Sequence, residues 1–413
     1  MWNKVFILFM ELKKVIGDNF TLDIPFKDLI ELYGTDEQKR ICDPLQLNQY
    51  GDLLLIRYGK YTDVFSGESE YDFVEFWDMY DGFYQECRSL VINIIKEELV
   101  LTPFKKFRNL NECEENSIEN IKKKIEIAKS IEITDKLDGS MQSARWYDNK
   151  VIMSGSQALN KSESWRLADG YNMLTTNKNY VTMLKDYSDY TFIFEYISLK
   201  DAHVVLYDKS QEGLYLIGVR EVETGNQLSY KDVLGLAKKY DVKCTKLYDK
   251  TLDEVMSELT VYKAYEKEGF VMNIDGHMVK IKCDDYVNIH RILSNISSIN
   301  LIIQKISEDQ FDDLISKVPE SYRDRVMNVA NIIFNYINET DRIVKELYET
   351  ADKADKKTFM IWVDNNVDNK FRGYLKNIYV GRENNYLKYG QRLKKLKEMG
   401  IQDGYSSLFV GED

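Results

Sequence analysis

The pattern of hydrophobic and polar positions changes once along the chain, near residue 290. Between about residues 50 and 290, short runs rich in β-branched and aromatic residues alternate with turn-forming residues, which is typical of strands. Two stretches between them, 117–130 and 230–240, have helical spacing. The strand-like runs are Leu53–Tyr58, Leu90–Ile95, Val151–Ser154, Thr191–Ile197, Leu214–Val219, Phe270–Ile274 and Met278–Cys283.

After residue 290 the apolar residues recur at three- and four-residue spacing, which predicts helices almost without interruption. The sequence therefore predicts an α+β domain over residues 1–290 and an all-α domain over residues 291–413. The expected helices are Ile289–Ile306, Ser307–Val318, Ser321–Thr350, Lys356–Asn365 and Asn385–Met399.

Composition agrees with a globular protein of two or three domains: of 413 residues, 44% are hydrophobic and 30% charged. Lys and Arg number 56 against 68 Asp and Glu, so the formal charge is −12. A chain this acidic does not attract nucleic acid through its overall field. Any polyanion that it binds must meet a local cluster of cations.

The 5 cysteines are scattered without a CxxC pair, and the 3 histidines form no HxxxH pair. A disulfide framework, a zinc ribbon and a histidine-based metal site are therefore not expected. The apolar run Val5–Met10 is too short to cross a membrane. These features predict a soluble, cytoplasmic protein that does not associate with membranes.

A lysine and an aspartate stand together near the end of the expected strand that begins at Ile131. Alternation along a strand places Ile131, Ile133 and Leu137 toward a core and puts Lys136 and Asp138 together on the opposite face, just before a glycine. This pair is either part of a reactive site or an ordinary surface ion pair.

Two lysines share one face of a second strand. Alternation directs Val279, Ile281 and Cys283 inward, which leaves Lys280 and Lys282 side by side. Two ammonium groups this close repel each other, and a bound polyphosphate would offset the repulsion. The alternative is an edge strand protected by lysines.

Carboxylates also occur inside apolar runs, at Glu195 and at Glu268. A carboxylate in such a setting is either paired with a cation or used in chemistry; Arg220 is one possible partner for Glu195. Upstream, Arg88 begins a strand, and residues 103–109, which include Lys106, form a compact basic and aromatic patch.

Taken together, these motifs resemble the covalent nucleotidyltransferases, that is, ATP-dependent polynucleotide ligases and capping enzymes. The ordered set is Lys136-Leu-Asp-Gly, Glu195, Glu268-Gly and Lys280-Ile-Lys. A wider set is similar to the phage tRNA-repair RNA ligases of the RNA ligase 1 type: Lys106–Glu112, Phe194–Tyr196, Leu216–Arg220 with Thr224-Gly225, and Lys280–Tyr286.

The resemblance covers residues 50–290 and departs from the family at two positions. Ser89 stands where the family usually has Gly, and Leu137 fills a position often held by Glu. The fold that it implies is a nucleotidyltransferase domain of antiparallel sheets with flanking helices, including an N-terminal subdomain over residues 1–80. The helical region matches the family's C-terminal domain by class only.

The resemblance implies ATP as the nucleotide and Mg²⁺, or Mn²⁺, as the metal. Lys136 would be the nucleophile that forms a lysyl-adenylate, and cations around it would favour its uncharged form. The implied roles of the other residues are triphosphate binding by Arg88, Lys106, Lys280 and Lys282, ribose binding by Glu195, adenine contact by Val271, and metal binding by Asp138 and Glu268. Val271 and its neighbour Phe270 are equally compatible with core positions.

The function predicted from the resemblance is ATP-dependent RNA ligation. The partners would be RNA ends with a 5′-phosphate and a 3′-hydroxyl, in particular tRNA broken in its anticodon loop, and the enzyme a monomer in the cytoplasm of a phage-infected host. The alternatives are a DNA ligase, a capping-type enzyme or a catalytically idle nucleic-acid-binding relative. Between residues 366 and 398, nine Lys and Arg face three acidic residues, which indicates either an RNA contact or a solvated helix face.

Overall fold

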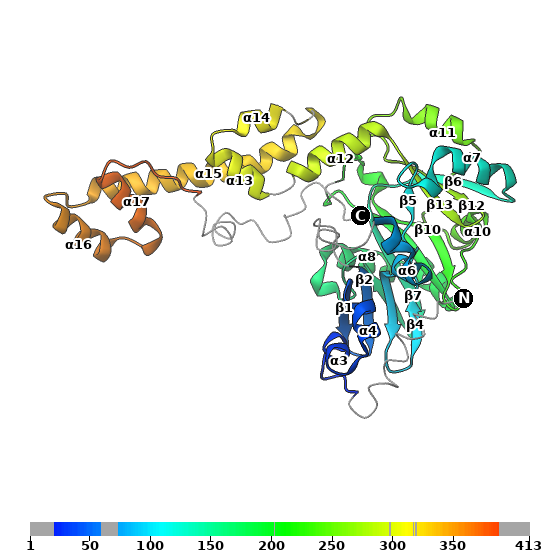
Figure 1. The fold of residues 1–413 in the computed structure, drawn as a ribbon. Helices are drawn as coiled ribbons and strands as arrows, with labels where there is room; N and C mark the ends of the chain where they lie inside the picture. Colours follow the sequence, from blue (N-terminus) through cyan, green and yellow to red (C-terminus); the bar gives the residue numbers. More distant parts are fainter. Residues whose placement is uncertain are drawn as a thin grey trace. The chain divides into compact units, whose positions relative to one another are not determined.

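The computed structural model describes residues 20–58, 73–201, 203–296, 299–316, 318 and 320–387. The chain divides into two compact units, the first reaching Val287 and the second beginning at Asn288. The first unit contains three sheets with flanking helices, whereas the described part of the second is helical (Figure 1). The predicted α+β fold followed by a helical region is confirmed.

The N-terminal sheet has the antiparallel order β1-β2-β3-β4 and is buried on both faces. Leu54 and Ile56 pack against the helices α3, α4 and α6, while Leu53 and Leu55 pack against Tyr147 of the second sheet. The elements are α3 (Phe26–Tyr33), α4 (Asp36–Cys42), β1 (Leu45–Tyr50), β2 (Leu53–Tyr58), α6 (Phe73–Glu86), β3 (Arg88–Asn93) and β4 (Glu98–Leu101).

The second sheet has the order β10-β9-β7-β8 and is covered on one face by helices α8, α9 and α10. Phe192 and Phe194 of β9 meet Leu167, Met183 and Val233 of these helices in a continuous core. The elements are β7 (Ser140–Tyr147), β8 (Lys150–Ser154), η3 (Lys161–Glu163), α8 (Trp165–Thr176), α9 (Lys178–Asp186), β9 (Tyr190–Ile197), η4 (Lys209–Gln211), β10 (Gly213–Glu221) and α10 (Tyr230–Tyr240).

The third sheet has the order β11-β6-β12-β13-β5, and all its pairs are antiparallel except the short β13–β5 pair. Because β5 pairs with Val279 and Lys280 of β13, the alternative of a lysine-protected edge strand is wrong. The elements are β5 (Arg108–Asn109), η2 (Glu114–Asn116), α7 (Ile118–Ile127), β6 (Ile131–Lys136), β11 (Leu247–Tyr248), α11 (Leu252–Leu259), β12 (Gly269–Ile274) and β13 (His277–Lys282).

The alternation predicted for β6 is only partly correct. Ile133 is buried, but Ile131 is 41% exposed, and Glu132 is buried where its carboxylate accepts a hydrogen bond from the backbone N–H of Tyr230. The strand ends at Lys136, so Asp138 lies in the connection to β7 and does not share a strand face with Lys136.

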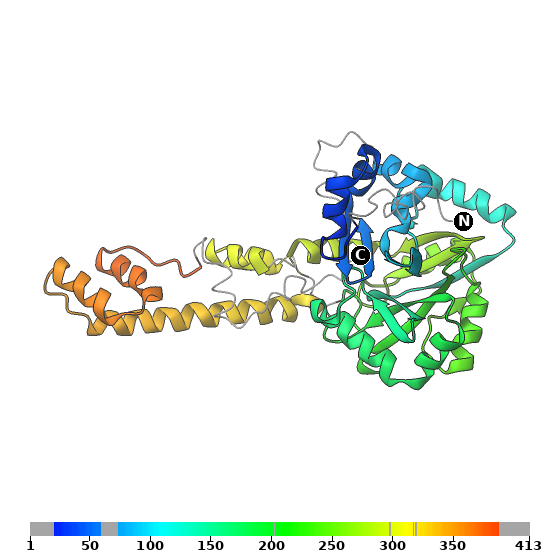
Figure 2. The same cartoon turned by 90° about the horizontal axis from the view of Figure 1, so that it is seen from below.

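In the described part of the second unit, the long helix α15 contacts α13 and α17, which lie toward its two ends (Figures 1 and 2). Val344, Phe359, Val363 and Leu375 are completely buried between α15, α16 and α17. The helices are α12 (Asp284–Ile296), which crosses the boundary between the units, α13 (Ile299–Ser307), α14 (Phe311–Ser316), α15 (Glu320–Thr350), α16 (Lys356–Asn366) and α17 (Asn369–Tyr379).

Two predictions fall largely outside the described residues. The run Val5–Met10 lies there, as does the part of the expected helix 385–399 that follows Leu387; its first three residues are not helical. Among the described residues, no helix has both the length and the apolar character required to span a bilayer. All five cysteines are described, and each is a free thiol.

Candidate active site

A cleft of about 630 Å³, open to solvent, lies in the first unit where strands β6, β12 and β13 of the third sheet meet β7, β9 and β10 of the second. Lys136 reaches it from the last position of β6. The residues that line it are Arg88, Phe104, Phe107, Thr134, Asp135, Lys136, Leu137, Gly139, Met141, Glu195, Ile217, Val271, Met278 and Lys280.

Glu268 joins two of the predicted lysines at one end of the third sheet. One of its oxygens, Oε1, lies 2.8 Å from Lys136 Nζ and 3.0 Å from Lys282 Nζ, and the Glu268 side chain is 1% exposed. The strand register causes this arrangement, because Gly269 at the start of β12 pairs with Lys136 on one side and with Lys282 on the other. The residue before it therefore stands between the two lysines.

This geometry differs from the expectation that neighbouring cations favour the uncharged form of the Lys136 amine. The amine forms an ion pair with the Glu268 carboxylate at 2.8 Å, and a carboxylate partner favours the ammonium form. The alternative of a surface ion pair with Asp138 is also wrong, since the Lys136 side chain is only 14% exposed and pairs with Glu268.

The alternation predicted for β13 is confirmed by burial: Val279 and Ile281 are inside, and both lysines lie on the other face. Their surroundings nevertheless differ. Lys280 lines the cleft, and its Nζ lies 5.1 Å from the centre of the Phe107 ring. Lys282 instead ends in the ion pair with Glu268. Only one of the paired lysines thus lines the cleft.

Glu195 of β9 lines the cleft, and the pKa of its carboxyl group differs from the ordinary value. Burial raises the pKa of its carboxyl group from 4.5 to about 8, and the positive charge of Lys136 only partly opposes this shift. At neutral pH the group is therefore mainly uncharged and can donate one hydrogen bond while accepting others. The alternative pairing with Arg220 is wrong, because Arg220 binds the carboxylate of Glu86 at 2.6 Å.

The glycine after Asp138 permits a close approach between the β6–β7 connection and β9. A Cβ atom at Gly139 would lie 2.7 Å from the carbonyl oxygen of Tyr196 and 2.8 Å from Cγ of Glu195. Real Cβ atoms do not come so close to backbone or side-chain atoms. Glycine at this position therefore lets Glu195 lie beside the Lys136 segment.

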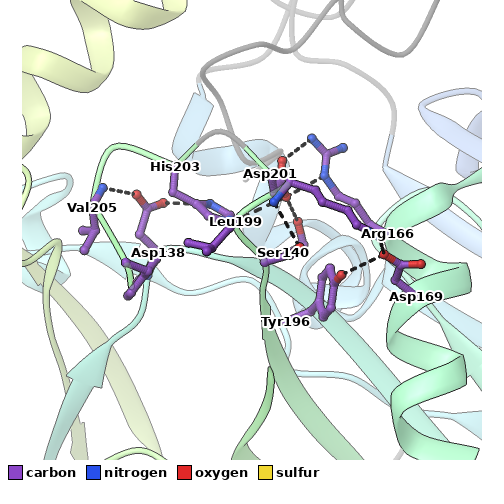
Figure 3. A network of polar contacts seen from close by, with 12 residues as sticks. Asp138, Ser140, Arg166, Asp169, Tyr196, Leu199, Asp201, His203 and Val205 are labelled. Atoms are coloured by element: carbon purple, nitrogen blue, oxygen red, sulfur yellow. Dashed lines mark hydrogen bonds and ion pairs between the residues drawn. The ribbon is translucent and has the colours of Figure 1, made fainter. Parts of the chain in front are cut away.

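The Asp138 carboxylate accepts hydrogen bonds from three groups of the protein itself. Its Oδ2 accepts hydrogen bonds from the backbone N–H groups of Val204 and Val205 at 2.7 and 2.9 Å, the second of which is drawn in Figure 3. Its Oδ1 accepts a hydrogen bond from the Tyr286 hydroxyl at 3.1 Å. The side chain is only 8% exposed. Asp138 thus holds the segment after β6 against the loop that follows β9.

The two basic residues predicted upstream lie in different places. Arg88 lines the cleft and lies 5.9 Å from the centre of the Phe107 ring. Lys106 lies over the Trp77 ring at 4.7 Å and lines a neighbouring cavity with Lys105, Arg108 and His277. Phe107 and Met278 line both spaces, so the two cavities adjoin.

Ser89 stands where the resembling family usually has Gly, and its backbone conformation is one that glycine adopts easily. Its φ of 64° lies in the left-handed region, which glycine adopts without steric cost. The hydroxyl of Ser89 donates a 2.8 Å hydrogen bond to the carbonyl of Ser156, which helps to hold this conformation.

The apolar side of the cleft was predicted in part. Val271 lines the cleft, whereas Phe270 is completely buried in the core. The core position thus applies to Phe270, and Val271 is the one placed where it could contact a base. Sequence reasoning missed Thr134, Met141, Ile217 and Met278. Alternation could have indicated two of them, since Thr134 and Met278 precede Lys136 and Lys280 by two positions on the same strands.

Comparison with known proteins gives one match to a family and several to solved structures. Residues 86–286 match the family model described as RNA ligase. A Naegleria gruberi RNA ligase mutant with ATP and Mn has a TM-score of 0.35 and 15% identity, over 45% of this chain and 57% of that one. This chain thus spans little more than half of that protein.

A second Naegleria gruberi RNA ligase mutant, with AMP and Mn, has a TM-score of 0.35 and 16% identity over 46% of this chain and 58% of that chain. An archaeal ATP-dependent RNA ligase has a TM-score of 0.45 and 14% identity, over 75% of this chain and 79% of that chain.

Proposed function

We propose that the cleft binds ATP and that Lys136 becomes covalently linked to AMP, because residues 86–286 match the family model described as RNA ligase. The chain would then join RNA ends that carry a 5′-phosphate and a 3′-hydroxyl. The observation that carries this proposal is the Lys136 amine in the cleft, held by Glu268 beside Lys282.

In the first step, Nζ of Lys136 attacks the α-phosphorus of ATP, a phosphorus–nitrogen bond forms, and the bond to the pyrophosphate oxygen breaks. The ammonium must lose a proton, to solvent or to the phosphates of ATP, before it can attack. The ion pair with Glu268 positions the amine while it is charged. Arg88 and Lys280, which line the same cleft, would offset the negative charge of the phosphates.

The remaining steps return the amine and make the new bond. An oxygen of the RNA 5′-phosphate attacks the phosphorus of lysine-bound AMP, which frees Lys136 and leaves an RNA capped by AMP. The 3′-hydroxyl of the other end then attacks the 5′-phosphate, and AMP departs. Glu195, largely uncharged at neutral pH, is suited to hydrogen bonds with ribose hydroxyls, and Val271 offers an apolar contact to the base.

The donor set near Lys136 suits a divalent metal held mainly by phosphate and water. Among the residues that the structure describes, there is no cluster of three or more His, Cys, Asp or Glu able to hold an ion. Since Mg²⁺ keeps several waters and usually takes one or two carboxylates, Glu268 would be its protein partner, and the ion would offset negative charge on the phosphates. Asp138, with three hydrogen bonds already made, is the less suited of the two predicted ligands.

The finer assignment concerns the RNA. We propose nicked tRNA as the substrate and the helical second unit as the part that contacts it. Lys370, Arg372, Lys376 and Arg382 of the basic segment are described. Of these, Lys376 already pairs with Asp364 at 3.0 Å. A solvated helix face therefore remains the competing explanation for this charge.

The test is incubation with ATP labelled in its α-phosphate, followed by separation of the protein under denaturing conditions. Wild-type protein should retain the label, and Lys136→Ala should lose it. Addition of 5′-phosphate RNA should transfer the label to RNA. A matched control is Lys105→Ala, which removes an exposed lysine that does not line this cleft; it should still form the adduct.

Three outcomes would contradict the proposal. If no adduct forms with ATP, the chain is a catalytically idle nucleic-acid-binding relative. Label taken from GTP would indicate a capping-type reaction. Preferred sealing of nicked duplex DNA would indicate a DNA ligase.

A further inference from the structure

The segment between β6 and β7 contains no strand hydrogen bonds of its own, yet it follows the Lys136 amine directly. Its position therefore depends on side-chain contacts. Asp138 and Ser140, on either side of Gly139, are both bound by the loop after β9: Asp138 accepts the backbone N–H groups of Val204 and Val205, and the Ser140 hydroxyl donates to Asp201 Oδ2 at 3.1 Å.

His203 lies between the two carboxylates that make these contacts (Figure 3). Its Nδ1 is 3.9 Å from Asp138 Oδ1, and its Nε2 is 3.7 Å from Asp201 Oδ2. The His203 side chain is 2% exposed, and those of Asp138 and Asp201 are 8% and 1% exposed. The imidazole thus lies between the carboxylate of Asp138 and the carboxylate of Asp201, which binds Ser140.

Helix α8 fixes the position of Asp201, the last carboxylate in this series of contacts. Arg166, near the start of α8, binds Asp201 through two nitrogens, at 2.6 Å to Oδ2 and 2.7 Å to Oδ1. Two parallel bonds of this kind define both position and orientation. Asp201 is therefore a fixed point that holds Ser140 by a hydrogen bond and lies 3.7 Å from Nε2 of His203.

A second set of contacts acts on the Asp138 end. The Tyr207 hydroxyl accepts a 2.8 Å hydrogen bond from the Asp138 backbone N–H, and the ring of Tyr207 meets that of His203 edge to face, with centroids 5.9 Å apart. The loop containing His203 and Tyr207 consequently holds Asp138 by both its backbone and its carboxylate.

We propose that His203, fixed by the Arg166–Asp201 ion pair, is a positioning residue that sets the Asp138–Gly139–Ser140 turn and thereby aims the Lys136 amine at its nucleotide. The proposal rests on the proposed function. It assigns to His203 no contact with substrate and no proton transfer. Since the turn is short and follows the nucleophile directly, a displacement at Asp138 is transmitted to Lys136.

The experiment compares His203→Leu, which keeps bulk without polar atoms, with His203→Gln, which keeps hydrogen-bonding capacity. The rate constant of lysine adenylation is measured in a single turnover over a range of ATP concentrations. For His203→Leu we expect a loss of about ten- to a hundredfold in the limiting rate, the size expected for misplacement of a reacting group, with half-saturation by ATP changed less. His203→Gln should recover part of the loss.

Sealing of pre-adenylated RNA separates positioning of Lys136 from a general structural defect, because this step does not use the free amine. We expect His203→Leu to seal such RNA at nearly the wild-type rate. Asn93→Ala is the control: it removes a buried side chain bound to Asp52 and Tyr147, away from the turn, and should lower thermal stability without selective loss of adenylation.

An adenylation rate of His203→Leu within twofold of wild type would overturn the inference, as would an equal loss in adenylation and in sealing. If His203→Leu does not fold, Ser140→Ala decides, because it removes only the bond to Asp201: selective loss of adenylation supports the inference, and an unchanged rate overturns it. A wild-type protein that forms no AMP adduct would instead contradict the proposed function.

Discussion

Glu195 lies in the wall of the cleft, where burial makes its charge depend on pH near neutrality. Burial raises the pKa of its carboxyl group to about 8, whereas the unfolded chain has the ordinary value of 4.5. Between these two values the unfolded chain releases a proton that the folded protein keeps. The contribution of Glu195 to stability is therefore fully present below about pH 4.5 and is lost as the pH rises through 8.

For Glu195→Gln we accordingly expect a free energy of unfolding that rises relative to wild type as the pH increases from 5 to 8. Glutamine has similar size and hydrogen-bonding capacity but does not ionise. Urea unfolding at pH 5, 6.5 and 8 measures the difference. A difference that stays constant over this range would show that Glu195 is ionised in the folded protein.

Ser89 offers a second prediction for a single residue. Ser89→Ala keeps the unfavourable positive φ and loses the hydrogen bond to Ser156, so it should destabilise the fold by about 1 kcal/mol. Ser89→Gly loses the same bond but relieves about 1 kcal/mol of backbone strain, so its stability should remain near that of wild type. Thermal or urea unfolding of both variants checks this order; equal losses would mean that the backbone is not strained.

At the scale of elements, the site depends on how closely the β6–β7 connection approaches β9. Gly139→Ala would place a methyl group against the carbonyl of Tyr196 and the side chain of Glu195. We expect destabilisation by about 1–3 kcal/mol from this overpacking and a loss of adenylation of about a hundredfold from the shift of Lys136. Unfolding and single-turnover labelling measure the two effects.

Gly235→Ala is the matched control for this substitution. Gly235 lies in α10, and a Cβ atom there has no neighbour within 4 Å. Because alanine is a better helix former than glycine, the variant should gain about 0.5–1 kcal/mol and keep full adenylation. Equal behaviour of the two alanine variants would contradict the steric explanation.

At the scale of the whole molecule, the two units allow nucleotide chemistry to be separated from RNA selection. The cleft and all its lining residues belong to the first unit. A chain that ends after Ile296 keeps Tyr286, the partner of Asp138, within α12.

We expect this shortened chain to form the AMP adduct at a rate within about threefold of the full chain and to lose its preference for nicked tRNA over unstructured RNA. Sealing of both RNAs by both chains measures the preference, with adduct formation as the control for folding. An unchanged preference would remove the second unit from substrate selection.

Local sequence patterns determined the fold class, the lysine face of β13 and the order of the chemical motifs. Strand alternation and helical periodicity are properties of neighbouring residues, so they can be read without knowing which elements meet. The same reasoning failed for Asp138, because nothing local marked the end of β6 at Lys136.

Tertiary structure alone decided which groups meet. The register of β12 places Glu268 between Lys136 and Lys282, Arg220 pairs with Glu86 instead of Glu195, and Lys106 lines a neighbouring cavity. His203 had no motif to mark it, since its place between Asp138 and Asp201 arises when the loop after β9 packs on the β6–β7 turn. Such contacts join residues distant in sequence, and they depend on register and packing that no local pattern encodes.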